Sequence, residues 1–403
     1  MKIVQINATS AIGSTGKIVK DLGKVIEENN SSFYILAAYG TDKRDNIMLT
    51  ERIKPVWAMR KNILISRLTG RMGYRNKRAT KKAIAWLDKI KPDVIHLHNF
   101  HGNWINVPML FDYIKKTEIA VVWTMHDCWP FTGRCSHFER NNCYQWKTNC
   151  EKCPNRKVYP ISYFFDHSKK MHRDKKEWFL GIKNLTVVTP SSWLASYVKE
   201  SFFGEYPVEV INNGIDTDKY IPVSSKSRHL SVAEGKKIVL GVASSWSARK
   251  GLYDFIELDK KIDHSKYQVV LVGLNERQLK EIPDTIIGIS RTNNEQELIE
   301  IYSQADVFLN PTYEDNYPTT NLEAISCGTP VITYKTGGSV ESVMNSDMIV
   351  EQGDVERLLE LVISVCNNPQ SSDELHRYAE NCFSKTEKFK EYLTLYNRIV
   401  NNN

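Results

Sequence analysis

The stretch PTYEDNYPTTNLEAISCGTPVITYKTGGSVE, residues 311–341, decides the fold of this chain. It follows an apolar run, ADVFLN at 305–310, whose composition is typical of a buried parallel strand. Pro311 ends that strand, NLEAISC has a helical pattern, and VITY at 331–334 forms the next strand. This strand–helix–strand order is typical of a doubly wound α/β fold, in which ligands bind at the carboxyl ends of the strands. The loop that begins at residue 311 is therefore a candidate site.

Two carboxylates flank this loop. Seven residues separate Asp315 from Glu323, and Thr319 and Thr320 come shortly before Glu323. A Ser or Thr followed three residues later by Glu is the pattern of a capping box, so we expect these side chains to cap the helix. The amino end of that helix would then attract an anionic ligand.

The spacing of the two acids resembles the Glu-x7-Glu motif of the family 4 retaining glycosyltransferases. Asp315 stands where that family usually has its first Glu, and residues 316–318, Asn-Tyr-Pro, replace the usual Gly-Phe-Gly. The run EDNYPTTNLEA is similar to that of the branch acting in bacterial exopolysaccharide and capsule assembly. The resemblance implies the α/β GT-B fold: two Rossmann-like, doubly wound parallel-sheet domains that face a central cleft. It also implies a C-terminal helix that crosses back to the N-domain.

The resemblance also implies a reaction. A hexosyl unit would pass with retention from a UDP- or GDP-sugar to a glycan acceptor, expected to be lipid-linked, in cell-surface polysaccharide synthesis. Asp315 would hold sugar hydroxyls and face an oxocarbenium-like charge, Glu323 would bind the ribose, and His126 would bind the sugar. The other implied donor-binding residues are Gly16, Arg249, Arg291, Asn316, Tyr317, Thr319, Thr320, Asn321, Gly337 and Gly338.

Lys250 matches the lysine with which the family contacts the donor diphosphate. A cation at a helix amino end opposes the helix dipole, so a phosphate partner explains this lysine better than helix stability does. The family usually has an Arg six residues earlier, where this chain has Ser244, and we expect Arg249 or another basic residue to replace it. No DxD-type Asp pair is positioned to hold a divalent cation, so we expect catalysis to need no cofactor.

The chain is long enough for two domains, because 403 residues suit two domains of ordinary size. Residues 212–216, NNGID, resemble the stretch that marks the domain boundary in the family. No apolar run approaches the roughly 18 residues that a membrane span needs, and MKIVQINATS is predicted to be a strand rather than a signal peptide. The expected parts are an acceptor domain at 1–221 with a Cys-rich insert at 126–160, a donor domain at 222–384, and a returning helix at 385–403.

Charge is unevenly distributed along the chain. Residues 1–220 hold 35 Lys and Arg against 21 Asp and Glu, whereas the rest hold 19 against 26. Residues 52–91 contain thirteen basic residues against one acid, and they predict an amphipathic helix on an anionic membrane surface. The alternative is a solvated helix packed on its domain. The arginines at helical spacing are Arg60, Arg67, Arg71 and Arg78. We therefore expect a cytoplasmic protein, peripheral on the inner face of the cytoplasmic membrane.

Five of the eight cysteines lie within residues 128–153. Four of them, Cys135, Cys143, Cys150 and Cys153, are compatible with a four-thiolate structural zinc site, although their spacing matches no standard zinc finger. The alternative is a set of free thiols packed in a loop, because disulfides are disfavoured in a reducing cytoplasm. A zinc ion there would brace the loop and take no part in the chemistry.

Three other functions are compatible with the sequence. A nucleotide-sugar-binding partner without turnover is one, because Ser244 replaces the expected Arg. A nucleotide-sugar epimerase of the same fold is another, and it would turn over donor without an acceptor. An RNA-binding protein would use the basic half, with steep salt dependence, but it leaves the acidic C-terminal half unexplained. We therefore expect no nucleic-acid partner.

Overall fold

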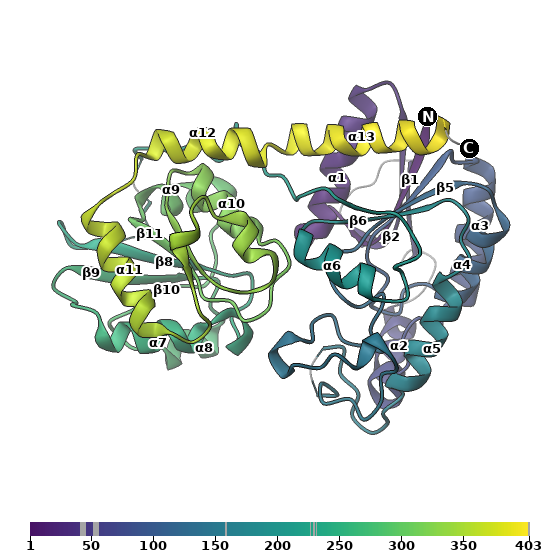
Figure 1. Ribbon diagram of the computed structural model, residues 1–403, viewed down its shortest axis with the longest axis horizontal. Helices are drawn as coiled ribbons and strands as arrows, with labels where there is room; N and C mark the ends of the chain where they lie inside the picture. The colour runs from purple at the N-terminus through teal and green to yellow at the C-terminus, as the bar shows by residue number, and fades with distance from the viewer. Residues whose placement is uncertain are drawn as a thin grey trace. The chain divides into compact units, whose positions relative to one another are not determined.

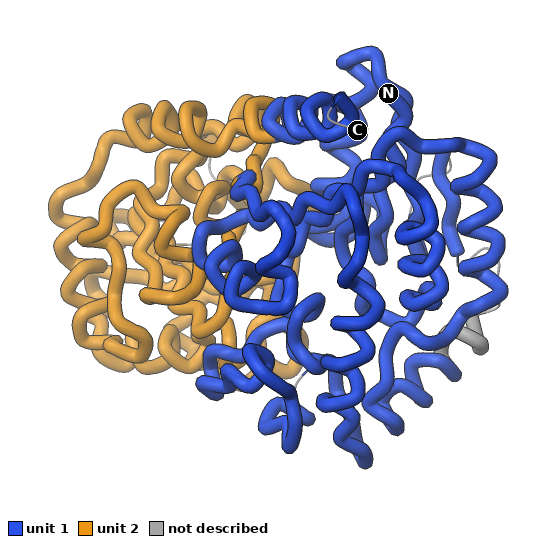
Figure 2. Tube along the Cα trace, turned by 45° about the vertical axis from the view of Figure 1, so that its right-hand side comes forward, with its two compact units in different colours: residues 1–211, 389–403 blue, residues 212–388 orange. Residues whose placement is uncertain are grey.

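The computed structural model describes residues 1–40, 46–50, 56–157, 159–225, 227–228, 230 and 232–401. The chain forms two compact units, which Figures 1 and 2 draw as ribbon and as trace. Unit 1 consists of residues 1–211 and 389–403, and unit 2 of residues 212–388. Each unit is built around one parallel sheet, so the predicted pair of doubly wound domains is confirmed.

Unit 1 contains a seven-stranded parallel sheet in the order β3-β2-β1-β4-β5-β6-β7. The order reverses between β1 and β4, which is the topological switch point where ligands bind in such sheets. The strands are β1 (Lys2–Ser10), β2 (Ser32–Gly40), β3 (Ile47–Leu49), β4 (Val94–Leu97), β5 (Ala120–Thr124), β6 (Leu185–Thr189) and β7 (Val208–Val210).

Helices cover both faces of this sheet, because the strands are apolar on both sides. One face carries α1 (Gly13–Glu28) and α13 (Lys385–Asn401), whose Tyr392 and Tyr396 are buried, so the predicted return of the C-terminal helix is confirmed. The other face carries α3 (Lys77–Ile90), α4 (Val107–Lys116), α5 (Ser168–Phe179) and α6 (Ser192–Glu200).

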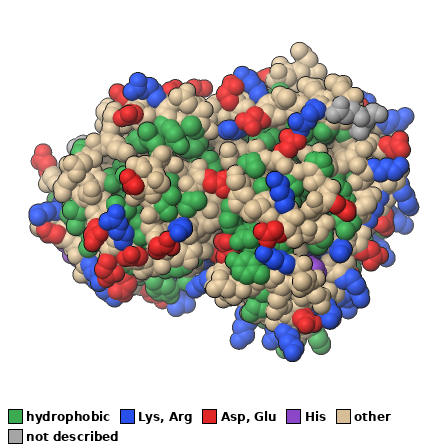
Figure 3. Space-filling model, in the orientation of Figure 1, with side chains coloured by type: hydrophobic (Ala, Val, Ile, Leu, Met, Phe, Trp, Pro, Cys, Tyr) green, Lys and Arg blue, Asp and Glu red, His purple; other side chains and the backbone are tan. Residues whose placement is uncertain are grey.

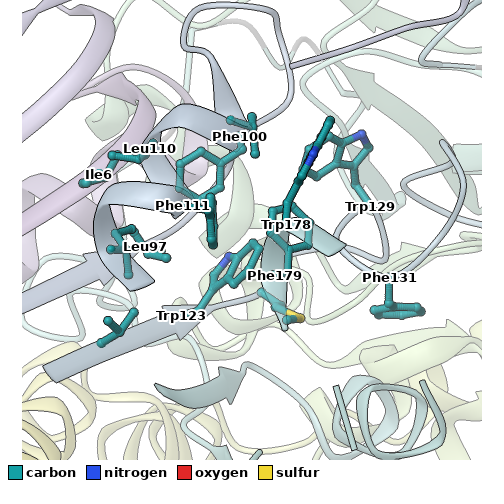
Figure 4. Close-up of a cluster of buried hydrophobic side chains, with 14 of the residues drawn as sticks. Ile6, Leu97, Phe100, Leu110, Phe111, Trp123, Trp129, Phe131, Trp178 and Phe179 are labelled. Atoms are coloured by element: carbon teal, nitrogen blue, oxygen red, sulfur yellow. The ribbon is translucent and has the colours of Figure 1, made fainter. Parts of the chain in front are cut away.

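An aromatic cluster fills the second face beneath the end of β5. The Trp123 ring lies edge-on to Phe179 with ring centres 4.8 Å apart, and Phe111 lies 4.6 Å from the same Phe179 ring (Figure 4). Trp123, Phe111 and Phe179 are fully buried. This packing fixes the strand end from which residues 126 and 127 emerge.

Unit 2 repeats the plan with a six-stranded parallel sheet in the order β10-β9-β8-β11-β12-β13. Its switch point lies between β8 and β11. The strands are β8 (Lys237–Val242), β9 (Tyr267–Val272), β10 (Ile287–Ile289), β11 (Val307–Asn310), β12 (Val331–Tyr334) and β13 (Ile349–Val350). The helices are α7 (Leu252–Lys261) and α11 (Val355–Asn367) on one face, α9 (Glu295–Gln304), α10 (Thr319–Ser326) and α12 (Ser372–Phe383) on the other, and the short α8 (Glu276–Glu281).

The boundary between the units lies earlier than the predicted one, after residue 211 instead of 221. Backbone pairing explains the difference. The Ile215 N–H donates to the Phe383 carbonyl at 2.8 Å, and the Lys385 N–H donates to the Ile215 carbonyl at 2.8 Å. The Lys385 ammonium also pairs with Asp216 at 2.7 Å. The NGID stretch is therefore bound to the end of α12 and belongs to unit 2.

The basic stretch does not form one amphipathic helix. It contains α2 (Val56–Thr69) and α3, and the chain between them passes through Gly70 and Gly73, both at positive φ. A helix cannot continue through two residues in the left-handed region, so the predicted arginine face is broken after α2. Residues 51–55, at the start of the stretch, lie outside the described part of the chain.

Surface charge is mixed on the drawn face of the molecule. Lys and Arg side chains lie singly or in small groups there, interspersed with acidic ones (Figure 3). No helix in the described part of the chain is both long and apolar enough to cross a membrane.

Candidate active site

Two loops meet at the switch point of unit 2, one after β8 and one after β11. The Lys250 ammonium forms an ion pair with the Asp315 carboxylate, and the Arg249 guanidinium donates to the Glu314 carbonyl at 2.6 Å. A backbone hydrogen bond also joins the two loops: the Tyr313 N–H donates to the Arg249 carbonyl at 2.8 Å. The predicted phosphate-site lysine and the predicted first acid are therefore in direct contact.

A glycine makes this contact possible. Gly251 has a φ of +74° and directly follows the short 3-10 helix at Ala248–Lys250. A Cβ at Gly251 would lie 2.2 Å from the Pro311 carbonyl oxygen, so no other residue fits without displacing one loop. The close approach aligns Lys250 with the β11 loop.

The second acid, Glu323, does not cap α10 as predicted. The helix begins at Thr319 after Pro318, and this N-cap residue makes no side-chain capping hydrogen bond. Instead, the Glu323 carboxylate accepts a hydrogen bond from the Tyr302 hydroxyl of α9 at 3.1 Å. Burial and the nearby carboxylate raise the pKa of Tyr302 well above its usual value, so its hydroxyl stays a donor. The capping-box prediction is therefore wrong.

Asn321, a predicted donor-binding residue, packs inside unit 2. Its side chain is fully buried, and its amide oxygen accepts from Asn310 at 2.7 Å. Its amide nitrogen donates to Ser339 at 3.2 Å and to Ser342 at 2.8 Å. Asn321 therefore ties α10 to β11 and to the segment after β12.

The other predicted donor residues surround this loop to different extents. Asn316 and Tyr317 are buried, and the Asn213 amide holds the Tyr317 carbonyl at 3.3 Å. Thr319 and Thr320, at the start of α10, are half-buried. The loops that follow β12 and β10 carry the remaining ones, Gly337, Gly338 and Arg291.

These remaining residues differ in their distance from the switch point. Gly337, at a φ of +49°, and Gly338 open a short 3-10 helix after β12, the strand next to β11. Arg291 is exposed after β10, the edge strand two places from β8. The structure therefore gathers Lys250, Asp315 and the glycines beyond the carboxyl ends of the inner strands β8, β11 and β12, and Arg291 follows the edge strand β10.

In unit 1, the predicted donor-binding residue Gly16 lies against the end of β1. It lies inside the first turn of α1, where a Cβ would meet the Thr9 hydroxyl at 2.7 Å. The N–H groups without an intrahelical acceptor in such a turn are those of residues 12–15. Gly16 therefore allows α1 to lie close to the end of β1, and the backbone donors come just before it.

His126 follows β5, is half-buried, and forms a chain of hydrogen bonds with the buried side chains of His98 and Gln5. Its Nε2 lies 3.0 Å from His98 Nδ1, and His98 Nε2 lies 3.0 Å from the Gln5 amide oxygen. Burial lowers the pKa of His126 to about 4 and that of His98 well below its usual value, so both rings are neutral near pH 7. Sequence reasoning selected His126 and missed Gln5, although a glutamine within an apolar strand is a signal of a buried hydrogen-bond partner.

A cavity of about 370 Å³ lies at the carboxyl ends of β1, β2 and β4 in unit 1. Trp104, Ile63 and other apolar residues form most of its wall, and Arg67 is the only Lys or Arg among its described lining residues. The Tyr159 hydroxyl and His101 Nδ1, both at this cavity, are 3.1 Å apart. A more open depression of about 560 Å³ lies at the amino end of β6, away from the strand ends that carry functional side chains.

The cysteine-rich segment between β5 and α5 has little regular structure beyond two short 3-10 helices, Glu139–Asn141 and Gln145–Lys147. None of the eight cysteines, all of which lie in the described part of the chain, forms a disulfide. A hydrogen bond from Cys153 lowers the pKa of Cys135 to about 7. The Cys150 sulfur accepts from the Gly133 N–H at 3.1 Å. Among the described residues, no three His, Cys, Asp or Glu side chains are arranged to hold a metal ion, so the predicted zinc set is not preformed.

Two family models match the chain, one in each half. Residues 59–219 match Glycosyltransferase Family 4, and residues 224–382 match Glycosyl transferases group 1. These two matches cover most of both units. The first includes His126, and the second includes Lys250, Asp315 and Glu323.

Similar proteins extend the match over the whole length. The putative colanic acid biosynthesis glycosyl transferase WcaC of Escherichia coli (strain K12) is 24% identical, over 99% of this chain and 100% of WcaC. The solved structure of sucrose-phosphate synthase from Thermosynechococcus elongatus covers 100% of both chains at 15% identity, with a TM-score of 0.72. Anabaena HepE in complex with UDP covers 99% of this chain and 100% of its own at 13% identity, with a TM-score of 0.66. The chain belongs to the glycosyltransferases of the GT-B fold that join a family 4 part to a group 1 part.

Proposed function

We propose that this protein is a retaining glycosyltransferase that moves a hexosyl unit from a nucleotide sugar to a glycan acceptor in cell-surface polysaccharide synthesis. The observation that carries the proposal is the Lys250–Asp315 pair, formed by two loops at the switch point of unit 2. The name of the E. coli relative, a putative colanic acid biosynthesis glycosyl transferase, supports a role in polysaccharide synthesis.

The donor's diphosphate is the leaving group, and its growing negative charge must be stabilised as the glycosidic bond breaks. Lys250 supplies a positive charge next to the β11 loop, and the backbone N–H groups after β12 can donate to phosphate oxygens. Asp315 exchanges its contact with Lys250 for sugar hydroxyls when the donor binds, and Glu323 accepts from the ribose. Catalysis proceeds without a divalent cation, because Lys250 and these amides carry the charge stabilisation.

The acceptor binds in unit 1. The cavity at the ends of β1, β2 and β4 joins an apolar wall to one guanidinium, that of Arg67. A ligand with an apolar portion and an anionic group suits such a lining, and a lipid-linked diphosphate oligosaccharide has both. Such an acceptor places the enzyme at the anionic inner face of the cytoplasmic membrane.

A donor panel tests the function. The purified chain is incubated with UDP-, GDP-, TDP-, ADP- and CMP-sugars, with and without membrane lipid extract that contains glycan acceptors. We expect that one of these donors releases its nucleotide, and that it does so only when acceptor is present. NMR should show an α-linked product from an α-linked donor. Product with inverted configuration would overturn the retaining assignment. Donor turnover without acceptor would favour the epimerase, and binding without turnover would favour the non-catalytic partner.

We also propose that the four predicted cysteines close around a structural zinc ion when the metal is supplied. Two buried cations close to these cysteines support this proposal. Lys175 is fully buried, and Arg134 is buried with two guanidinium nitrogens, Nε and Nη1, that have no hydrogen-bond partner. Both cations interact electrostatically with Cys135. Four thiolates on Zn²⁺ carry a net charge of −2, which these two cations would balance.

Metal analysis tests the zinc site on protein purified without a histidine tag. We expect about one zinc per chain, and a loss of that zinc when Cys150 and Cys153 are both replaced by Ser. Structural zinc sites bind tightly, so a content below about 0.2 zinc per chain would end the hypothesis. Replacing Cys366, a buried thiol of α11 in unit 2, by Ser is the control and should leave the zinc content unchanged.

A further inference from the structure

A buried side-chain amide begins a chain of hydrogen bonds in which only one choice of donor and acceptor is possible at each step. Gln5 lies in the middle of β1 and is fully buried. Its side-chain nitrogen lies 3.0 Å from the backbone carbonyl of Val19 in α1. A carbonyl oxygen can only accept, so the amide nitrogen must point to Val19 and the amide oxygen must point away from it.

The position of the amide oxygen determines which ring nitrogen of His98 carries the hydrogen. Gln5 Oε1 lies 3.0 Å from His98 Nε2, and because an amide oxygen only accepts, His98 Nε2 must carry a hydrogen. His98 is buried and neutral, so its other nitrogen, Nδ1, has a lone pair and no hydrogen. The orientation of one amide thereby fixes the tautomer of His98.

The same step repeats at the second histidine. His98 Nδ1 lies 3.0 Å from His126 Nε2, so His126 Nε2 must be the donor. A neutral His126 then has a lone pair at Nδ1. Each tautomer follows from the hydrogen bond made by the opposite ring nitrogen, which is how proteins usually set the active nitrogen of a histidine.

We propose that Gln5 and His98 are positioning residues that hold His126 as the Nε2–H tautomer, with Nδ1 an obligate acceptor for a hydroxyl of the transferred sugar. This inference rests on the proposed function together with the family resemblance, which implies that His126 binds that sugar. An acceptor nitrogen selects a neutral hydroxyl donor and repels a carboxylate. The substrate class is therefore a nucleotide-activated neutral sugar with a hydroxyl at this position, and uronic acids with a carboxylate there are excluded.

A second network in the same core provides a matched control. His96 Nε2 lies 2.8 Å from the Thr124 hydroxyl, and the Tyr396 hydroxyl lies 2.6 Å from His96 Nδ1. These groups are as buried as Gln5. The His96 ring packs against His98 with ring centres 4.1 Å apart, but its two hydrogen bonds join Thr124 and Tyr396. Tyr396→Phe therefore removes one buried hydrogen bond and keeps the hydrogen bonds from Gln5 through His98 to His126.

The test is the ¹⁵N spectrum of histidine side chains in the full chain, because the two ring nitrogens shift differently when protonated. We expect His98 and His126 both to be Nε2–H tautomers, with His126 assigned from the signals lost in His126→Gln. Gln5→Met keeps the side-chain volume and removes the strong acceptor. His98 can then donate from Nδ1, and we expect signals of an Nδ1–H tautomer at His126. Tyr396→Phe should leave the His126 signals unchanged.

Activity provides the second measurement. Gln5→Met should raise KM for the nucleotide sugar about tenfold or more, and Tyr396→Phe should leave it within about twofold. A wild-type His126 with its hydrogen on Nδ1 would overturn the proposal, and so would an unchanged His126 spectrum in Gln5→Met. If that variant does not fold, the wild-type spectrum still decides the tautomer. Equal turnover of a neutral donor and the matching uronic-acid donor would overturn the substrate class. The spectra need no substrate, so they stand apart from the outcome of the donor panel.

Discussion

Replacing Lys250 by methionine is expected to lower kcat/KM for glycosyl transfer by about 100- to 1,000-fold, the usual loss when one group that stabilises a developing anion is removed. Methionine keeps an unbranched chain of similar length, so the loops after β8 and β11 keep their backbone contact. The fold should survive, because the Tyr313–Arg249 and Arg249–Glu314 hydrogen bonds remain. The rate of nucleotide release with the preferred donor is the measurement, and circular dichroism checks the fold.

Lys261→Met is the control for this variant. Lys261 ends α7, at the opposite end of the helix from Gly251, and forms a solvent-exposed ion pair with Glu356 at 2.8 Å. Exposed pairs contribute little, so the control should keep its activity within about twofold. Equal activity of Lys250→Met and Lys261→Met would remove Lys250 from the phosphate site.

Gly251→Ala should destabilise the protein by about 2–5 kcal/mol, from the left-handed backbone conformation together with overpacking. The alanine Cβ would lie 2.2 Å from the Pro311 carbonyl oxygen and 2.7 Å from the Pro311 ring. Relief requires the loop at Pro311 to move away from Gly251, which separates Lys250 from Asp315. Activity should therefore fall with stability. Urea unfolding, followed by fluorescence, measures the loss.

Gly235→Ala separates the two causes. Gly235 also has a positive φ, +85°, but a Cβ there would meet no atom within 4 Å. Only the backbone strain remains, so we expect a loss of about 1–2 kcal/mol and normal activity. If both variants lost the same stability, the close approach of Gly251 to Pro311 would not be what aligns the loops.

The order of elements was predictable from local patterns. Apolar runs such as residues 305–310 and 331–334 became neighbouring parallel strands, because strands buried on both faces are continuously apolar. The contact between Lys250 and Asp315 followed from where each residue stands relative to its strand. Both are near the carboxyl ends of strands that flank a switch point, and the fold brings such ends together.

Sequence reasoning was least informative where a distant partner competed with a local one. Glu323 has the spacing of a capping residue, but Tyr302 offers its carboxylate a buried hydroxyl donor. Asn321 looks like a polar residue at a loop, yet Ser339 and Ser342 enclose its amide. Gln5 is a polar residue in an apolar strand and therefore needs a hydrogen-bond partner, but the sequence does not indicate that this partner is His98. Such partners are set by tertiary packing, which spacing does not reveal.

The most direct measurement is a thermal melt of the wild-type chain with UDP, GDP, TDP, ADP and CMP. A ligand at about 100 times its dissociation constant adds about 2.7 kcal/mol, which raises the melting temperature by several degrees. We predict that one nucleoside diphosphate raises the melting temperature of the wild type, and that Lys250→Met loses most of the shift. No shift with any nucleotide would contradict a diphosphate site at Lys250 and Asp315, and with it the proposed glycosyl transfer from a nucleotide sugar.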